Sequence, residues 1–322
     1  MSPSKCTLAP LLFALTACNP ACTAPAADAP EGQVAGGAQP IAQEPAGDDA
    51  QEPAEQAEAS GPTAPPGETI NTAKGVDLSG LDENKKTVFF QLLNTEMSAC
   101  GKPESLAKSL RDDASCRDSL SVSQFIADAL KAGHAPADIK EAMEMVLDSL
   151  KVREINIAGA PVYGNERAPV TIVVFADFEC PHCRAEAPVL RQVVDQYRGR
   201  VRLVFKHFPL SGHLRARAAA IATEAAKEQN KFWEMHDIVF KNQTSLEDED
   251  IYRYAKQIGL DMARFKASYE AKKGEKKVDV DRSEGEKLEI SGTPAVFING
   301  RYFNDLLFGG TVAGWVEDAL RR

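Results

Sequence analysis

The feature that most constrains this chain is a pair of cysteines, Cys180 and Cys183, placed directly after a strand-like run. Residues 170–175 are mostly β-branched and, apart from Thr171, apolar, the pattern of a strand buried on both faces. The Cys-Pro-His-Cys motif that follows opens a helical pattern reaching Tyr197. Because residues three apart on a helix share a face, the two sulfurs are expected within disulfide distance. The order of strand, CxxC and helix predicts a redox-active dithiol.

The expected helix start also suits the chemistry of a thiolate. Unsatisfied N–H groups and roughly half a positive charge at a helix amino end favour an anion. The sequence places Cys180 there, with Pro181 in the first turn and His182 as a further group that tunes the thiolate. A stabilised thiolate favours the reduced dithiol, which makes the corresponding disulfide a better oxidant.

The rest of this half predicts an α/β domain. Residues 201–205 form a second expected strand, which completes a right-handed βαβ unit, and residues 213–288 are largely helical. Two short strands at 294–298 and 301–303 are joined by Asn-Gly, a strong hairpin signal, and a helix is expected at 311–320.

Four runs of this half resemble the DsbA-like branch of the thioredoxin superfamily: FADFECPHC, VRLVFKHFPL, FWEMHDIVF and ISGTPAVFING. The resemblance covers residues 161–322. It implies a thioredoxin fold over residues 155–322, with a helical insertion at about 211–289. It also implies thiol-disulfide exchange without a cofactor.

The resemblance carries roles onto individual residues. Cys180 is expected to be an exposed nucleophile, and Cys183 a deeper resolving thiol. Thr293 and Pro294 match the substrate-docking segment of the family, which implies a cis bond before Pro294 and an exposed backbone at Thr293 that pairs with an extended peptide.

One position departs from the family pattern. Thioredoxin-like proteins often have a buried acid six residues before the nucleophile, and here that position is Val174. The proton acceptor for Cys183 therefore stays open, with Asp177, Glu179 and Lys206 as candidates.

Other uses of a CxxC motif are disfavoured. A c-type haem site requires histidine after the second cysteine, where this chain has Arg184, and a zinc site requires further ligands that no second CxxC supplies. No metal or cofactor is predicted. His207 and His213 are expected to be surface or capping residues.

Within redox chemistry, an oxidase is favoured over an isomerase or reductase kept reduced by a membrane partner. A tethered docking protein without catalysis is the third hypothesis.

The first 17 residues resemble a lipoprotein signal peptide. An apolar run at 8–17 ends in Leu-Thr-Ala followed by Cys18, which is similar to the bacterial lipobox and implies lipid on Cys18. Residues 18–75 are rich in Ala, Pro and Glu, and are expected to be a disordered tether.

The predicted location is the cell envelope, facing the periplasm or otherwise outside the cytoplasm, anchored by lipid. The expected partners are reduced or misoxidised exported proteins and a membrane protein that recycles the dithiol. Nucleic acid is not expected, because basic patches with interleaved aromatic residues are absent.

Residues 76–154 predict a small helical module. Of the seven cysteines, Cys100 and Cys116 remain to form a structural disulfide once the signal, lipid and CxxC positions are assigned. Cys22 is left as a bystander, a second lipid candidate or an intermolecular bridge. The module weakly resembles three-helix modules of cytochrome c maturation but lacks their CxxC. Oligomerisation as a homodimer, or partner docking, is therefore favoured over a second redox centre.

Overall fold

The computed structural model describes Thr63, Pro65 and residues 67–322. The expected signal peptide, Cys18, Cys22 and most of the expected tether lie outside the described residues. Within the tether range, Ile70 is buried, and its N–H and C=O bond the side-chain amide of Asn94. Packing therefore begins a few residues before position 76. None of the described helices is both long and apolar enough to cross a membrane.

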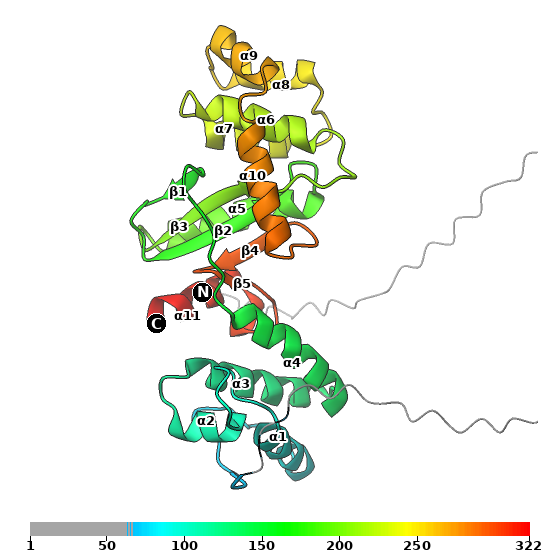
Figure 1. The fold of residues 1–322 in the computed structure, drawn as a ribbon, viewed down its shortest axis with the longest axis vertical. Helices are drawn as coiled ribbons and strands as arrows, with labels where there is room; N and C mark the ends of the chain where they lie inside the picture. The colour runs from blue at the N-terminus through cyan, green and yellow to red at the C-terminus, as the bar shows by residue number, and fades with distance from the viewer. Residues whose placement is uncertain (1–62, 64, 66) are drawn as a thin grey trace, which may run out of the picture. The chain divides into compact units, whose positions relative to one another are not determined.

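A mixed sheet in the order β1-β3-β2-β4-β5 forms the centre of the C-terminal half (Figure 1). Its strands are β1 Val162–Gly164, β2 Val170–Ala176, β3 Val201–His207, β4 Ala295–Ile298 and β5 Arg301–Tyr302.

The predicted βαβ unit is confirmed. Strands β2 and β3 run parallel, in a register that pairs Val170 with Val201, and α5 (Pro181–Gln196) connects them. Strand β4 lies antiparallel to β2 on its other side, with Phe175 opposite Ala295. This register brings the start of β4 beside the end of β2, where the CxxC motif begins.

The hairpin between β4 and β5 is also confirmed. Asn299 and Gly300 both have positive φ angles, 46° and 81°, which suits the right-handed twist of a tight hairpin. Strand β1 was not predicted. It is a three-residue strand that pairs antiparallel with β3.

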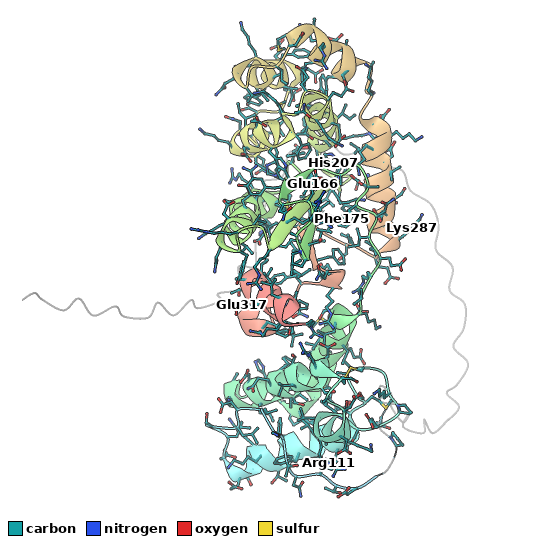
Figure 2. All side chains as sticks on the ribbon, turned by 90° about the vertical axis from the view of Figure 1, so that its left-hand side faces the viewer. Arg111, Glu166, Phe175, His207, Lys287 and Glu317 are labelled. Atoms are coloured by element: carbon teal, nitrogen blue, oxygen red, sulfur yellow. A yellow bond between two sulfur atoms is a disulfide. The ribbon has the colours of Figure 1, made fainter. Side chains whose placement is uncertain are left out.

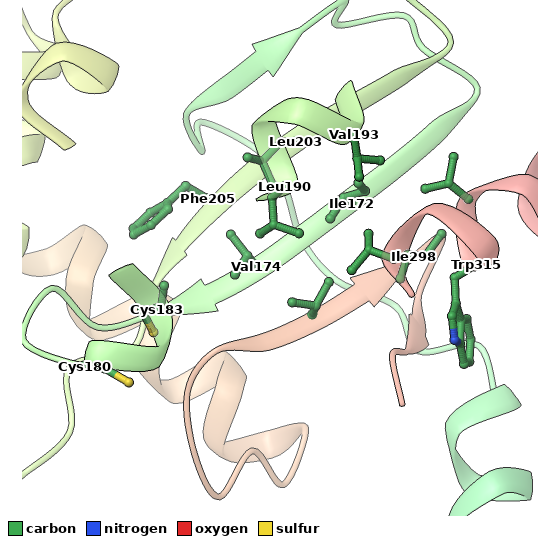
Figure 3. Packing of buried hydrophobic residues seen from close by; sticks show 14 of the residues in the cluster. Ile172, Val174, Cys180, Cys183, Leu190, Val193, Leu203, Phe205, Ile298 and Trp315 are labelled. Atoms are coloured by element: carbon green, nitrogen blue, oxygen red, sulfur yellow. The ribbon is translucent and has the colours of Figure 1, made fainter. Parts of the chain in front are cut away.

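The two faces of the sheet are covered by different helices. One face packs Ile172, Val174 and Leu203 against Leu190 and Val193 of α5, and α11 (Val312–Arg321) adds the buried Trp315 (Figure 3). On the other face, Phe175 packs edge-to-face against Phe208 and Phe297. Phe175 lies in the middle of the domain (Figure 2).

The helical insertion predicted between the strands is present as five helices among the described residues. They are α6 Ala216–Lys227, α7 Phe232–Lys241, α8 Asp248–Gln257, α9 Met262–Glu270 and α10 Glu275–Lys287. Helix α10 packs against β3 and approaches the sheet closely at Gly285, where an added Cβ would lie 2.5 Å from the Phe208 ring. A buried ion pair of 2.8 Å between Lys206 of β3 and Asp281 of α10 joins the same two elements.

The N-terminal region is helical, as predicted, and contains α1 Glu83–Thr95, α2 Leu106–Asp112, α3 Arg117–Ala132 and α4 Pro136–Leu150. Helix α4 begins at Pro136, and the left-handed Gly133 follows the last residue of α3. Helix α2 begins after its N-cap residue Ser105, whose side chain accepts a hydrogen bond from the Lys108 N–H. A disulfide joins Cys100 and Cys116, which fastens the segment before α2 to the start of α3.

Asp118 connects this helical region to the sheet. Its carboxylate accepts hydrogen bonds from Arg301 of β5, at 2.7 and 3.2 Å, and from Arg322 after α11, at 2.6 Å. The Asp118 side chain is almost fully buried, and both arginines are mostly buried. The first turn of α3 is therefore held against two elements of the C-terminal half.

Candidate functional site

Cys180 and Cys183 lie at the end of α5 that faces the carboxyl end of β2 (Figure 3). Cys180 is the N-cap residue of α5, in extended conformation, and Pro181 is the first helical residue. Cys183 is one turn further along, and its side chain is directed toward the sheet (Figure 3). Both cysteines are free thiols in this structure. The first turn of α5 carries no acidic residue.

Asp177 holds the turn between β2 and α5 in place. Its carboxylate accepts hydrogen bonds from the Glu179 N–H at 2.6 Å, the Leu210 N–H at 2.7 Å and His213 Nδ1 at 2.8 Å. Only the Asp177 main-chain N–H reaches the Cys183 sulfur, at 3.5 Å. The Asp177 carboxylate is therefore already occupied by bonds that shape the loop.

The other two candidate proton acceptors are occupied as well. Glu179 accepts from the N–H groups of Arg215 and Ala216 at the start of α6. Lys206 lies on the face of the sheet that α10 covers, where it pairs with Asp281 and Glu284. None of the three candidates presents a free polar side-chain group to Cys183.

Both cysteines are more buried than the sequence suggested. Cys180 was expected to be exposed, yet only 5% of its surface is accessible, compared with 2% for Cys183. The neighbouring Thr293 segment accounts for part of this burial: the Cys180 thiol donates a 3.2 Å hydrogen bond to the Thr293 carbonyl. Pro181 and His182 between the cysteines are exposed.

Burial strongly disfavours a thiolate at Cys183. It raises the pKa of Cys183 to about 12, although the hydrogen bond from the Asp177 N–H acts in the opposite direction. At neutral pH Cys183 is therefore a thiol, and it has to lose a proton before it can attack a disulfide.

The segment before β4 completes the site. The Thr293–Pro294 peptide bond is cis, which confirms that prediction. Thr293 and Pro294 are half-buried, and Ser291 and Gly292 before them are exposed. The Thr293 hydroxyl is buried near the Cys183 thiol and acts to lower the pKa of Cys183, although it has no partner of ordinary hydrogen-bond geometry among the described residues.

Gln243 supports the same turn from the insertion. It is mostly buried, and its amide donates to the carbonyl of Phe178 at 2.9 Å and to that of Cys180 at 2.7 Å. The sequence reasoning missed this residue, because it is 63 positions from Cys180 in a segment without a recognisable motif.

The histidines differ from expectation in one case. His207, expected to be a surface or capping residue, is fully buried, with Nε2 3.2 Å from the Glu224 carboxylate. His213 caps the active-site loop through Asp177, in agreement with the expected capping role. The part of the chain that the structure describes has no cluster of three or more His, Cys, Asp or Glu side chains that could hold a metal.

A small cavity lies beneath Cys183, on the α5 side of the sheet. Its volume is about 10 Å³, close to that of one water molecule. Val174, Glu186, His236 and Pro294 line it together with Cys183. Glu186 is a second residue that the sequence reasoning missed, and its spacing of three from Cys183 on a helix was a signal that could have identified it.

Comparison with known proteins identifies the fold family. A family model described as thioredoxin matches residues 157–318, half of the chain. A probable disulfide bond formation protein D of Bacillus cereus is 34% identical over 153 residues, which cover 44% of this chain and 70% of that protein.

Further relatives carry the same domain in another context. A protein of Salinispora tropica named Na(+)/H(+) antiporter NhaA 3 is 42% identical over 141 residues, 44% of this chain. The match spans only 22% of that antiporter's length. Among solved structures, oxidised BdbD from Bacillus subtilis has 23% identity and a TM-score of 0.47, covering 53% of this chain and 98% of that one.

The matched residues contain the dithiol, the cis-proline segment and the whole sheet described above. The chain belongs to the thioredoxin family, and residues 157–318 form a DsbA-like thiol-disulfide oxidoreductase domain.

Proposed function

We propose that the whole protein is a thiol-disulfide oxidase that introduces disulfides into exported proteins. The observation that carries this proposal is the position of Cys180 at the amino end of the sixteen-residue helix α5, with no acidic residue in its first turn. Helix N–H groups favour the sulfur anion, and a stabilised thiolate makes the oxidised pair a stronger oxidant. The exposed His182 is proposed to act on the same sulfur.

The proposed reaction begins from the oxidised pair. A substrate thiolate attacks the Cys180 sulfur, the bond to Cys183 breaks, and Cys183 leaves with the electron pair and takes up a proton. A second thiolate of the substrate then attacks its own sulfur in the mixed disulfide and releases Cys180 as a thiolate. The substrate gains one disulfide, and the enzyme becomes a dithiol.

Thr293 and Pro294 are proposed to dock the substrate. The Thr293 carbonyl is 3.2 Å from the Cys180 sulfur, so a peptide aligned along this segment would bring its own cysteine to that sulfur. The exposed Ser291 and Gly292 leave the approach along the main chain open. Main-chain pairing with an extended segment is tolerant of sequence, which suits an enzyme with many substrates.

The location and partners are also proposals. We propose export, lipid on Cys18 and tethering to a membrane by residues 18–75, on the lipobox-like sequence alone. A membrane protein is proposed to reoxidise the dithiol. The helical region is proposed to dock partners or a second copy. Replacement Cys18→Ser should release the protein from the membrane fraction, and unchanged fractionation would refute lipid anchoring.

The reduction potential of the Cys180–Cys183 pair tests the direction of the reaction. Equilibration with glutathione buffers should give a value near about −120 mV for an oxidase. A value near about −270 mV would instead identify a reductase or isomerase that is kept reduced. If Cys180→Ala leaves all cellular effects of the protein intact, the docking hypothesis replaces catalysis.

A further inference from the structure

The buried Cys183 thiol requires a nearby proton acceptor. Its pKa of about 12 means that spontaneous ionisation at neutral pH is rare. The strand beneath it offers no acid, because Val174 lines the cavity at that level. The polar side-chain groups of Asp177, Glu179 and Lys206 are bound elsewhere.

Glu186 occupies the remaining side of the cavity. It lies in α5 three residues after Cys183, so the two side chains project from one face of the helix. Both residues line the same cavity of about 10 Å³. The walls of this space are almost entirely apolar, so it offers no ready site for a relaying water, and the proton has to pass directly between the two side chains.

The Glu186 carboxylate is available to accept a proton. It is half-buried, and no hydrogen bond or ion pair reaches it from any residue that the structure describes. Burial raises the pKa of Glu186, since no positive group offsets the loss of water. A carboxylate with a raised pKa is a stronger base than one at the surface.

The other titratable groups at the cavity are less suited. His236 of α7 also lines it, but burial lowers the pKa of His236, and its Nδ1 is 2.8 Å from Asp237. Asp237 is in turn paired with Arg191 at 2.6 Å. The sheet side contributes only apolar residues: Val174, Ala176, Leu203 and Phe205.

We propose that Glu186 is the proton acceptor and donor for Cys183. The inference rests on the proposed thiol-disulfide exchange. In the resolving step, Glu186 takes the Cys183 proton, the Cys183 sulfur attacks Cys180 in the mixed disulfide, and the partner leaves as a thiolate. In the reverse step, Cys183 leaves as a thiolate and recovers the proton from Glu186. The Glu186 carboxyl replaces an acid on the strand, where this chain has Val174.

Reaction with oxidised glutathione separates the two steps. The Cys180 thiolate first forms a mixed disulfide and releases one glutathione thiolate, and Cys183 then displaces the second. Rapid acid quenching followed by mass spectrometry measures both rates in the full chain. Glu186→Gln should slow the second step by about a hundredfold at pH 7. The first step, which involves only Cys180, should keep its rate.

The pH profile distinguishes a base from a structural residue. The second step of the wild-type protein should level off once Glu186 is ionised, whereas in Glu186→Gln it should keep rising with pH. Glu186→Asp, which retains a carboxylate, should recover part of the rate. The exposed Glu249→Gln, with the same change of charge, should behave as wild type. The thermal stability of Glu186→Gln should be unchanged or higher, because a half-buried unpaired charge is removed.

Equal second-step rates in Glu186→Gln and wild type would overturn the role of Glu186 and leave the proposed function intact. Equal slowing in Glu186→Gln and Glu186→Asp, with reduced thermal stability in both, would also overturn it. Absence of both steps in the wild-type protein would instead overturn the proposed function, and this inference with it.

Discussion

The thiol of Cys180 donates a 3.2 Å hydrogen bond to the main-chain carbonyl of Thr293, 113 residues further along the chain. This bond exists because β4 pairs with β2 in a register that places the two segments side by side. The pairing of β4 with β2, rather than a local motif, thus brings the Cys180 sulfur and the Thr293 main chain together.

The two cysteines should have separable roles. Cys180→Ala should abolish oxidation of a reduced dithiol peptide, because no sulfur remains to form the mixed disulfide. Cys183→Ala should instead accumulate mixed disulfides that are visible on non-reducing gels. Wild-type activity in both variants would contradict these roles.

Gln243 should stabilise the active-site turn. Gln243→Ala leaves the buried carbonyls of Phe178 and Cys180 without their donor, which should lower the free energy of unfolding by about 1–3 kcal/mol. Denaturant unfolding measures the loss. The exposed neighbour Thr244→Ala serves as the control and should change stability by less than about 0.5 kcal/mol.

Glu224 should contribute to the pH dependence of stability. Burial acts to raise its pKa, but the hydrogen bond and charge of His207, with Lys227, outweigh burial and hold the pKa below the ordinary value of 4.5. A lowered folded-state pKa gives stability that is present above pH 4.5 and is lost as the pH falls through the folded pKa. Glu224→Gln should therefore unfold more easily at pH 7, and the difference from wild type should shrink below pH 4.5. A constant difference across denaturant titrations at several pH values would contradict this.

Asp118 should couple the helical region to the sheet. Asp118→Ala removes one of the two carboxylates that Arg301 and Arg322 share, and Asp318 remains, so the change should cost about 1–3 kcal/mol. The pair between Glu68 and Arg111 is largely exposed to water, so Glu68→Ala should destabilise the protein less than Asp118→Ala does. Unfolding curves that rank these two variants in the opposite order would refute the prediction.

Leu214 should contribute to substrate binding. Its side chain is 89% exposed, while its neighbours His213 and Arg215 are fixed to the active-site turn through Asp177 and Glu179. Leu214→Ser should raise the KM for a peptide substrate by roughly tenfold, with unchanged stability, if the peptide buries this side chain. Val280→Ser on α10, also exposed, is the control and should leave KM unchanged.

The sequence alone predicted a structural element wherever the local residue pattern and the fold require the same conformation. The buried run of β2, the CxxC helix start and the Asn299–Gly300 turn each impose one conformation, and all three are present. Strand β1 was missed because its three residues alternate too briefly to show a period, and pairing with β3 alone makes them extended. A strand of this length has no sequence signature of its own.

The site was less predictable than the fold for a related reason. Cys180 and Cys183 were identified from a contiguous motif, but the burial of Cys180 depends on Thr293, which only the sheet register brings close. Gln243 and Glu186 reach the site only in the folded chain. Gln243 comes from the helical insertion, and Glu186 lines a cavity that exists only after α5 packs on the sheet. Charge type alone favoured Asp177, Glu179 and Lys206, whose side chains the fold commits to other bonds.

The close approach at Gly285 has a consequence for motion. At Gly285 no side chain separates α10 from the Phe208 ring, and Lys206 of β3 is buried against Asp281 of α10. We therefore expect α10 and the sheet to move together as a rigid unit. We expect that accommodation of differently shaped polypeptides falls to the segment 291–294, where Thr293 lies beside the Cys180 sulfur. Hydrogen exchange should accordingly be slow along α10 and fast at the exposed Ser291 and Gly292.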